Sequence, residues 1–467
     1  MFFKPLINSA VLGASALMLG ACGGSSGPAD TPGSSSASSS SQSSQASDSS
    51  QSSSSADNHR IRIDPEVRHQ TVDGFGGALP MWNVVTESLT DSEVQSLVGK
   101  GENELGFSIL RTIVDPDAAD WDRAAGSLAE AKTHSDEVTI LASPWTPPAH
   151  MKSDNSQNNG GRLLPEYYGD YADHLNAYID FMLAQGVEID VMSVQNEPDY
   201  APDYQSAEWT GEEIRDFVRD YGDQIQAELL IAESLRFNRD YTDPSLSDPE
   251  ALANVDYVGG HLYDAENSGN FAPYPLAEEK NIPRWMTEWN YHKADGDGAA
   301  IWGGDNAAVW DETLDVVLAS VHKSMDVNWS AYVWWWSLRF YSFLGDGDSQ
   351  YGTERGQILK RGWAFSHYSK FVRPGYQRVE LSLEGLNSVE ATAYDSGDGE
   401  WVVVILNRSD EDYAEVEVEL PKSLSDADAY ITSRAHNRAP LSVTLAEGAV
   451  SIPTLEARSV VTLLMTE

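Results

Sequence analysis

Two glutamates stand at the ends of short apolar runs, an unusual place for an ionisable side chain. Glu197 ends the segment Val191–Glu197, and Glu288 ends the segment Trp285–Glu288. Burying a charged carboxylate is costly unless its charge is paired or used. Two such groups can divide a reaction, because a protonated one donates a proton while an ionised one attacks. The pattern predicts a catalytic pair; the alternative is two structural carboxylates bonded to buried arginines.

Carboxylate pairs of this kind cleave glycosidic bonds with retention when they lie about 5–5.5 Å apart. One protonates the leaving oxygen and the other attacks the anomeric carbon. The chain also holds 14 Trp and 20 Tyr, whose flat faces can stack on sugar rings, although we expect most of them in the core. These features favour glycoside hydrolysis, which needs neither a metal nor an organic cofactor.

Other chemistries lack their motifs. There is no Gly-x-Ser-x-Gly turn for a serine esterase, and the single cysteine, Cys22, excludes a cysteine-based metal site. No spacing matches a recognised calcium loop, so structural calcium stays an open question. His150, His261 and His292 lie near the motifs, and we interpret His261 as a structural residue at a strand end.

Eight apolar runs alternate with amphipathic segments between residues 72 and 336. We expect strands at Val72–Gly76, Ser108–Ile113, Thr139–Trp145, Val191–Gln195, Leu229–Glu233, Tyr257–Tyr263, Trp285–Trp289 and Trp329–Trp336, and helices at Tyr167–Leu183, Glu212–Leu229 and Ala307–Lys323. This alternation predicts an α/β fold, a (β/α)₈ TIM barrel, because an open doubly wound sheet would carry a glycine-rich fingerprint after its first strand. Catalytic residues of such barrels lie at the carboxyl ends of strands, where Glu197 and Glu288 would close the fourth and seventh strands and face each other.

The sequence after Pro374 changes to short strands without a helical period. We expect strands at Val389–Tyr394, Trp401–Leu406, Tyr413–Leu420, Ala429–Thr432, Leu441–Leu445 and Val460–Met465. They predict an attached C-terminal antiparallel β-sandwich side domain, to which Arg60–Ile63 can add a strand. Such a domain either binds carbohydrate or supports the barrel.

The N-terminus has the pattern of an export signal. Lys4 precedes the apolar run Leu6–Leu19, which is too short to cross a bilayer, and Leu19-Gly20-Ala21-Cys22 resembles a bacterial lipobox. Cys22 would then carry the lipid. Between Ser34 and Ser55, 16 of 22 residues are Ser, which predicts a flexible tether.

These boundaries predict a signal peptide at 1–22, a disordered linker at 23–58, a catalytic barrel at 59–375 and a side domain at 376–467. Residues 59–71 are expected either in the barrel unit or in the side domain. We expect a secreted monomer held at the bacterial outer membrane or cell surface by lipid alone. With 73 acidic and 30 basic side chains the formal charge is −43, which excludes nucleic acid as a partner. The expected partner is the polysaccharide that the carboxylate pair would cleave.

An ordered series of motifs resembles glycoside hydrolase family 30, and within it the bacterial glucuronoxylanases. The motifs are VDGFGG at 72–77, SPWTPP at 143–148, MKS at 151–153, GGRL at 160–163, NEP at 196–198, GGHLY at 259–263, KRG at 360–362 and KFVRPG at 370–375. The match runs from about Ile61 to Arg378 and more loosely to the C-terminus. Single motifs are weak, but the ordered set is specific.

The resemblance implies cleavage of β-1,4-xylan and assigns roles to matching residues. Glu197 would be the acid/base, Glu288 the nucleophile, and Asn196 the residue that holds the sugar 2-hydroxyl. Trp145, Tyr263 and Trp335 would wall the cleaved subsite, with Trp82 a less certain fourth wall.

The resemblance is weaker around the expected uronic acid pocket. Arg339 and Tyr341 match residues that bind a glucuronic acid branch, but Leu338 and Asn290 replace an Arg and a Tyr of the group, and the loop at 342–357 and the one through Trp302 are longer. Other specificities therefore stay open, namely those of a xylobiohydrolase, a β-xylosidase or a β-1,6-glucanase, as does endo or exo action. A non-catalytic carbohydrate-binding lipoprotein is the alternative outside enzymes.

Overall fold

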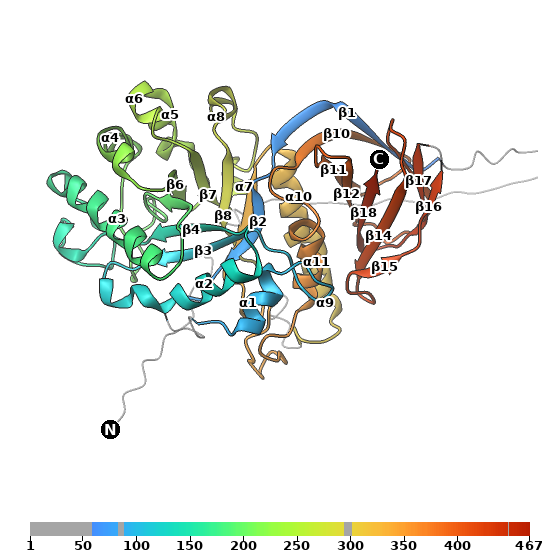
Figure 1. Ribbon diagram of the computed structural model, residues 1–467, viewed down its shortest axis with the longest axis horizontal. Coiled ribbons are helices and arrows are strands. Elements are labelled where there is room, and N and C mark those ends of the chain that lie inside the picture. Colours follow the sequence, from blue (N-terminus) through green and yellow to red (C-terminus); the bar gives the residue numbers. More distant parts are fainter. Residues whose placement is uncertain (1–57, 83–87, 294–300, 447) are drawn as a thin grey trace, which may run out of the picture. The chain divides into compact units, whose positions relative to one another are not determined.

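Eight parallel strands close into a barrel in a computed structural model that describes residues 58–82, 88–293, 301–446 and 448–467 (Figure 1). The strands are β2 (Gly74–Ala78), β3 (Ile109–Val114), β4 (Thr139–Pro144), β5 (Val191–Ser193), β6 (Glu228–Ser234), β7 (Tyr257–His261), β8 (Arg284–Glu288) and β9 (Ala331–Trp334). The predicted TIM barrel is confirmed. The largest difference is at the eighth barrel strand, expected over Trp329–Trp336 and observed as β9 over Ala331–Trp334, and β5 ends two residues before Gln195.

Helices and turns connect the barrel strands. The α-helices are α1 (Asp91–Val98), α2 (Ala125–His134), α3 (Tyr168–Ala184), α4 (Gly211–Tyr221), α5 (Asp243–Ser247), α6 (Pro249–Leu252), α7 (Ala265–Ser268), α8 (Pro275–Lys280), α9 (Ala307–Glu312), α10 (Ala319–Asp326) and α11 (Lys360–Ser369). Short 3₁₀ turns lie at Ala118–Arg123, Ala149–Met151, Pro165–Tyr167, Gly222–Gln224 and Arg239–Tyr241, and a π-helical turn lies at Thr313–Leu318.

Local sequence explains where several helices begin and end. Thr90 with Glu93, and Thr210 with Glu213, form capping boxes that start α1 and α4. The helix expected over Glu212–Leu229 stops at Tyr221, because a 3₁₀ turn follows and the chain enters β6 at Glu228. The helix expected over Ala307–Lys323 is likewise divided by the π-helical turn.

The interior of the barrel holds an apolar layer. Its buried cluster is Ile109, Leu141, Val191, Leu230, Trp285, Ala331 and Val333. Backbones approach closely here: a Cβ on Gly76 would lie 1.7 Å from the carbonyl oxygen of Ile109. Because this layer fills the barrel interior, the polar side chains of the site lie at the carboxyl ends of the strands, where the loops begin.

The remaining strands form a second, ten-stranded sheet in the order β15-β14-β18-β12-β11-β10-β1-β13-β17-β16. They are β1 (Arg60–Thr71), β10 (Gln377–Glu384), β11 (Val389–Asp395), β12 (Glu400–Asn407), β13 (Tyr413–Glu419), β14 (Asp426–Ser433), β15 (Ala439–Leu441), β16 (Thr444–Ala446), β17 (Ala449–Leu455) and β18 (Ser459–Thr466). All pairings are antiparallel except β1 with β13. No predicted run covered β10 or β17, and the single run predicted over Leu441–Leu445 is divided between β15 and β16.

The second sheet shares an apolar core with the barrel helices. Tyr394, Val402 and Val460 belong to the same buried cluster as the barrel's outer core. Helix α11 packs against strands of both sheets, and its buried His367 bonds to the hydroxyls of Thr432 and Thr462 at 2.8 and 2.7 Å. These contacts support the barrel. Within the described residues, no helix is long and apolar enough to span a bilayer.

Candidate active site

Glu197 is positioned by backbone bonds beyond the end of β5. The amide of Asn196 donates to the carbonyl of Pro144 at 2.8 Å, and the amide of Glu197 donates to that of Glu233 at 2.9 Å. Glu197 has a φ of 45°, in the left-handed region that side chains other than glycine rarely adopt. Strain of this kind persists only where surrounding bonds fix it, and it is frequent at functional sites.

Glu288 is the last residue of β8 and lies across the barrel mouth from Glu197. One oxygen of each carboxylate and one nitrogen of His261 all lie within 4.8 Å of one another. Both carboxylate side chains are only 8% exposed. Both carboxylates can therefore act on a single glycosidic bond.

Burial and two neighbours set the proton affinity of Glu197. Burial raises the pKa of its carboxyl, the hydrogen bond from His261 Nδ1 at 3.0 Å lowers it in part, and the charge of Glu288 raises it again. Burial alone would lower the pKa of His261, but Glu288, Glu197 and Glu233 together outweigh it and raise the pKa to about 9. Glu197 is therefore an acid with a raised pKa beside a cationic imidazole.

A buried arginine and a tyrosine hold Glu288. The Tyr263 hydroxyl donates to Oε1 at 2.9 Å, and Arg111 Nη1 donates to Oε2 at 2.6 Å. Arg111 Nη2 also donates to Oδ1 of Asn196 at 2.6 Å. The Arg111 guanidinium carbon lies 4.7 Å from the ring centre of Trp145. Arg111 thus connects the nucleophile candidate, Asn196 and one aromatic wall.

Arg111 and Glu233 were not among the predicted site residues. Their side chains are fully buried, 3.1 Å apart. Burial by itself would raise the pKa of Glu233, but the Arg111 charge together with His261 and Ser193 outweighs it and lowers the pKa to about 2. Both residues interrupt apolar strands, β3 and β6, which is the same signal that identified the two glutamates. The salt bridge to a barrel arginine, considered as the alternative for both glutamates, is found within the described residues at Glu288 and not at Glu197.

Three predicted aromatic residues meet beside the carboxylates. The ring centre of Trp82 lies 5.3 Å from that of Trp145 and 6.0 Å from that of Trp335, and those of Trp145 and Trp335 are 6.1 Å apart. Tyr204, which sequence reasoning missed, lies 6.0 Å from Trp82 and is 40% exposed. Such a group of rings offers stacking surfaces to a sugar.

The residues expected around a uronic acid pocket make different contacts in the structure. Arg339 Nη1 donates to Oδ2 of Asp346 at 2.7 Å. Tyr341 is buried and stacks on His292, with ring centres 4.2 Å apart. Asn290 donates from Nδ2 to the Tyr263 hydroxyl at 3.0 Å, so it supports a residue that contacts Glu288.

Cys22, the predicted lipidation site, lies outside the described residues.

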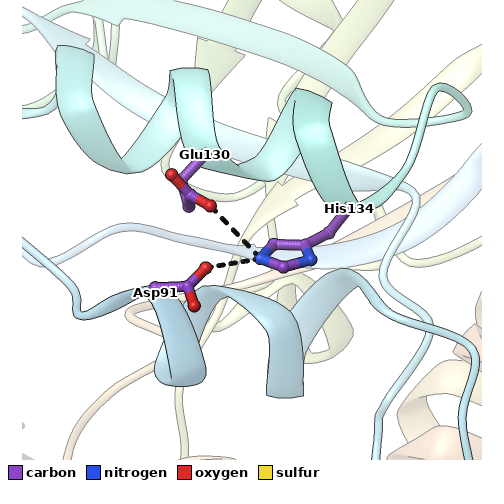
Figure 2. A group of neighbouring side chains, drawn as sticks. All are labelled: Asp91, Glu130 and His134. Carbon is purple, nitrogen blue, oxygen red and sulfur yellow. Dashed lines mark hydrogen bonds and ion pairs between the residues drawn. The ribbon is translucent and has the colours of Figure 1, made fainter.

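A second cluster of possible metal ligands lies at the surface between α1 and α2. His134 Nε2 is 2.7 Å from Oδ1 of Asp91 and 3.4 Å from Oε1 of Glu130, and Figure 2 shows both carboxylates directed at the imidazole. His134 is in the last turn of α2, where a protonated imidazole is favourable. We interpret this cluster as a group of surface side chains that bond to one another.

Comparisons with known proteins agree with this geometry. Residues 117–285 match the Glycosyl hydrolase family 30 TIM-barrel domain, and residues 375–463 match the Glycosyl hydrolase family 30 beta sandwich domain. The chain is 35% identical over 387 residues to glucuronoxylanase XynC of Bacillus subtilis (strain 168), covering 81% of this chain and 85% of the relative.

Solved structures give the same result. Xyn30A of Clostridium acetobutylicum, a glycoside hydrolase family 30 subfamily 8 xylanase, has a TM-score of 0.73 at 27% identity, with 88% of this chain and 100% of that chain covered. A GH30 endoxylanase from Clostridium papyrosolvens C71 has a TM-score of 0.72 at 28% identity, with 87% and 100% covered. The resemblance seen in the sequence motifs is confirmed: the protein is a glycoside hydrolase that belongs to glycosyl hydrolase family 30 and is similar, within it, to the bacterial glucuronoxylanases.

Proposed function

We propose that this protein is a retaining endo-β-1,4-xylanase that cleaves xylan, glucuronoxylan included, by double displacement. The observation that carries the proposal is the pair Glu197 and Glu288, with one oxygen of each within 4.8 Å at the barrel mouth. The similarity to a glucuronoxylanase over most of both chains supports the choice of substrate.

In the first step Glu197 gives its proton to the glycosidic oxygen while Glu288 attacks the anomeric carbon. The bond to the leaving sugar breaks and a covalent glycosyl ester forms on Glu288. The charge of Glu288 is then gone, and that charge had raised the pKa of Glu197. Glu197 therefore becomes a stronger acid and is left ionised, ready to accept a proton from water.

In the second step water attacks the anomeric carbon from the side on which the leaving sugar departed. Glu197 takes the proton, the ester bond breaks, and Glu288 is restored as a carboxylate. Tyr263 and Arg111 orient Glu288 throughout. Because Arg111 occupies the amide oxygen of Asn196, the amide NH₂ of Asn196 is the group that donates to a sugar hydroxyl.

Export and anchoring are part of the proposal. The lipobox-like segment ending at Cys22 and the Ser-rich stretch that follows support a lipid-anchored protein outside the cytoplasm. Its polymeric substrate cannot enter a cell, so an external location suits the reaction. We expect a monomer whose partner is the polysaccharide.

The stereochemistry of the first product tests the mechanism. Proton NMR during the early hydrolysis of xylan should show the β-anomer before mutarotation, because two displacements restore the configuration. An α-anomer formed first would exclude the proposal. Product sizes from the same reaction distinguish endo action, which gives a range of oligosaccharides, from a xylobiohydrolase or β-xylosidase, which gives one short product.

A further inference from the structure

Arg339, the arginine expected to bind an acidic sugar, forms an ion pair with a carboxylate of the same chain. Arg339 Nη1 lies 2.7 Å from Oδ2 of Asp346, and the Asp346 side chain is only 2% exposed. The Arg339 amide donates to the carbonyl of Leu344 at 3.0 Å. This turn brings residues seven positions apart together, so the pair is built by the loop that follows β9.

The rest of the loop holds Asp346 in place. Its Oδ1 accepts from the Asp348 amide at 3.1 Å and from the Thr353 hydroxyl at 3.2 Å. Further along, Arg355 forms two hydrogen bonds with Glu93 of α1, at 2.7 and 3.1 Å. Asp346 is therefore a fixed acceptor rather than a mobile surface carboxylate.

The pair lies in the loop that follows an aromatic wall of the site. Arg339 comes four residues after Trp335, whose ring centre is 6.1 Å from that of Trp145, and Tyr341, between Arg339 and Asp346, stacks on His292. Burial raises the pKa of Tyr341 above its ordinary value, the Arg339 charge lowers it, and the charges of Glu288 and Asp346 raise it. A branch on a sugar bound between the aromatic rings and Glu288 would be the substrate group that meets Arg339.

We propose that Asp346 is a specificity-determining residue: it satisfies Arg339 from within the chain, so that cleavage does not depend on an acidic branch on the xylan. The inference rests on the proposed function. A uronic acid carboxylate would meet a guanidinium whose charge is already balanced, and a second carboxylate beside Asp346 would be repelled. Without Asp346, Arg339 could bind that carboxylate by charge-assisted hydrogen bonds.

The test compares kcat/KM on three substrates of equal backbone length: linear xylo-oligosaccharide, the same chain with a glucuronic acid branch, and that branched chain with its carboxyl reduced to an alcohol. The wild-type protein should cleave all three at rates within about threefold of one another, since Arg339 is already neutralised. Asp346→Asn keeps the shape of the side chain but removes its charge. It should raise kcat/KM on the acidic substrate about tenfold and leave the other two unchanged.

Two further variants identify the cause. Asp348→Asn makes the same change two residues away and should leave all ratios as in the wild type. Arg339→Ala added to Asp346→Asn should remove the gain, because the guanidinium is then absent. Thermal unfolding verifies that each variant is folded.

Two results would overturn the inference. One is a wild-type preference of tenfold or more for the acidic over the linear substrate, which needs no variant to detect. The other is an unchanged ratio in folded Asp346→Asn. Failure of the wild type to cleave any of the three would instead contradict the proposed function.

Discussion

Glu197 and Glu288 differ in the donors that contact them. Glu288 accepts from Arg111 and Tyr263, whereas Glu197 accepts from His261 and has a pKa raised chiefly by burial. Environments that treat two carboxyl groups differently assign them different roles, one as acid and the other as nucleophile. The asymmetry supports the proposed division between them.

Replacing Glu288 by Gln should remove activity. The amide is not a nucleophile, so kcat should fall by about four orders of magnitude or more. The fold should remain, but the free energy of unfolding should fall by about 1–3 kcal/mol, because the amide NH₂ cannot accept from Arg111 or Tyr263. Initial rates on xylan and denaturant unfolding measure both effects.

The matched variant is Glu197→Ala. It should lose about 10²–10⁴-fold on xylan and much less on aryl glycosides, whose leaving groups need little protonation. Near wild-type activity of Glu288→Gln, or the same large loss of Glu197→Ala on both substrate types, would contradict the assigned roles.

The two ends of the barrel strands have different roles. Residues at the carboxyl ends take part in the chemistry, and residues at the opposite ends contribute to stability. The carboxyl ends of β5 and β8 lead into the two glutamates. At the opposite end, ahead of β2, Asp73 accepts a hydrogen bond from the Trp285 indole at 2.7 Å. Residues at that face of a barrel usually contribute to stability rather than to catalysis.

Asp73→Asn should stabilise the protein at alkaline pH. Burial raises the pKa of Asp73 from its ordinary 3.8 to about 6. The folded state therefore holds this proton more tightly than the unfolded state, and stability falls as pH rises from about 4 to above 6, by roughly 3 kcal/mol in all. An Asn stays neutral and its oxygen can still accept from Trp285.

Urea unfolding at pH 4, 6 and 8 measures this effect. The variant and the wild type should agree at pH 4, and the variant should be more stable by about 3 kcal/mol at pH 8. The exposed Asp136 gives a control, since Asp136→Asn should change stability little at either pH. A variant less stable than the wild type at pH 8 would show that the charge itself is needed.

At the scale of the whole molecule, the second sheet contributes core to the barrel helices and β1 joins it from the N-terminal side. A buried interface of this kind favours one folding unit, so separate domains are not expected to unfold independently. The formal charge of −43 gives the protein a strongly anionic surface that repels anionic lipid. Electrostatic binding to an anionic membrane is therefore unfavourable.

Cys22→Ser should release the protein from the membrane fraction without changing kcat/KM. A serine could not carry a thioether-linked lipid, and we expect the Ser-rich stretch to act as a tether between the proposed anchor and the barrel. Cell fractionation followed by activity assays on the soluble and membrane fractions measures the result. Unchanged membrane association would refute the lipobox interpretation.

The sequence alone was enough to predict the barrel and to place two glutamates at the carboxyl ends of its strands. Apolar runs and helical periods are properties of single segments, and a carboxylate that ends an apolar run is locally conspicuous. No predicted run covered β10, although Val379–Glu384 alternates apolar with exposed polar residues. Its place in the sheet is set by pairing with β1, more than 300 positions away.

Only the tertiary structure decided which groups touch the glutamates. Arg111 reaches Glu288 across 177 positions and Asn196 across 85, and no local pattern specifies such pairs. Even Arg339 and Asp346, seven positions apart, meet because the chain turns back at Leu344. Hydrophobic periodicity is set within a segment, whereas a side-chain pair depends on how closed strands and turns direct two segments toward one point.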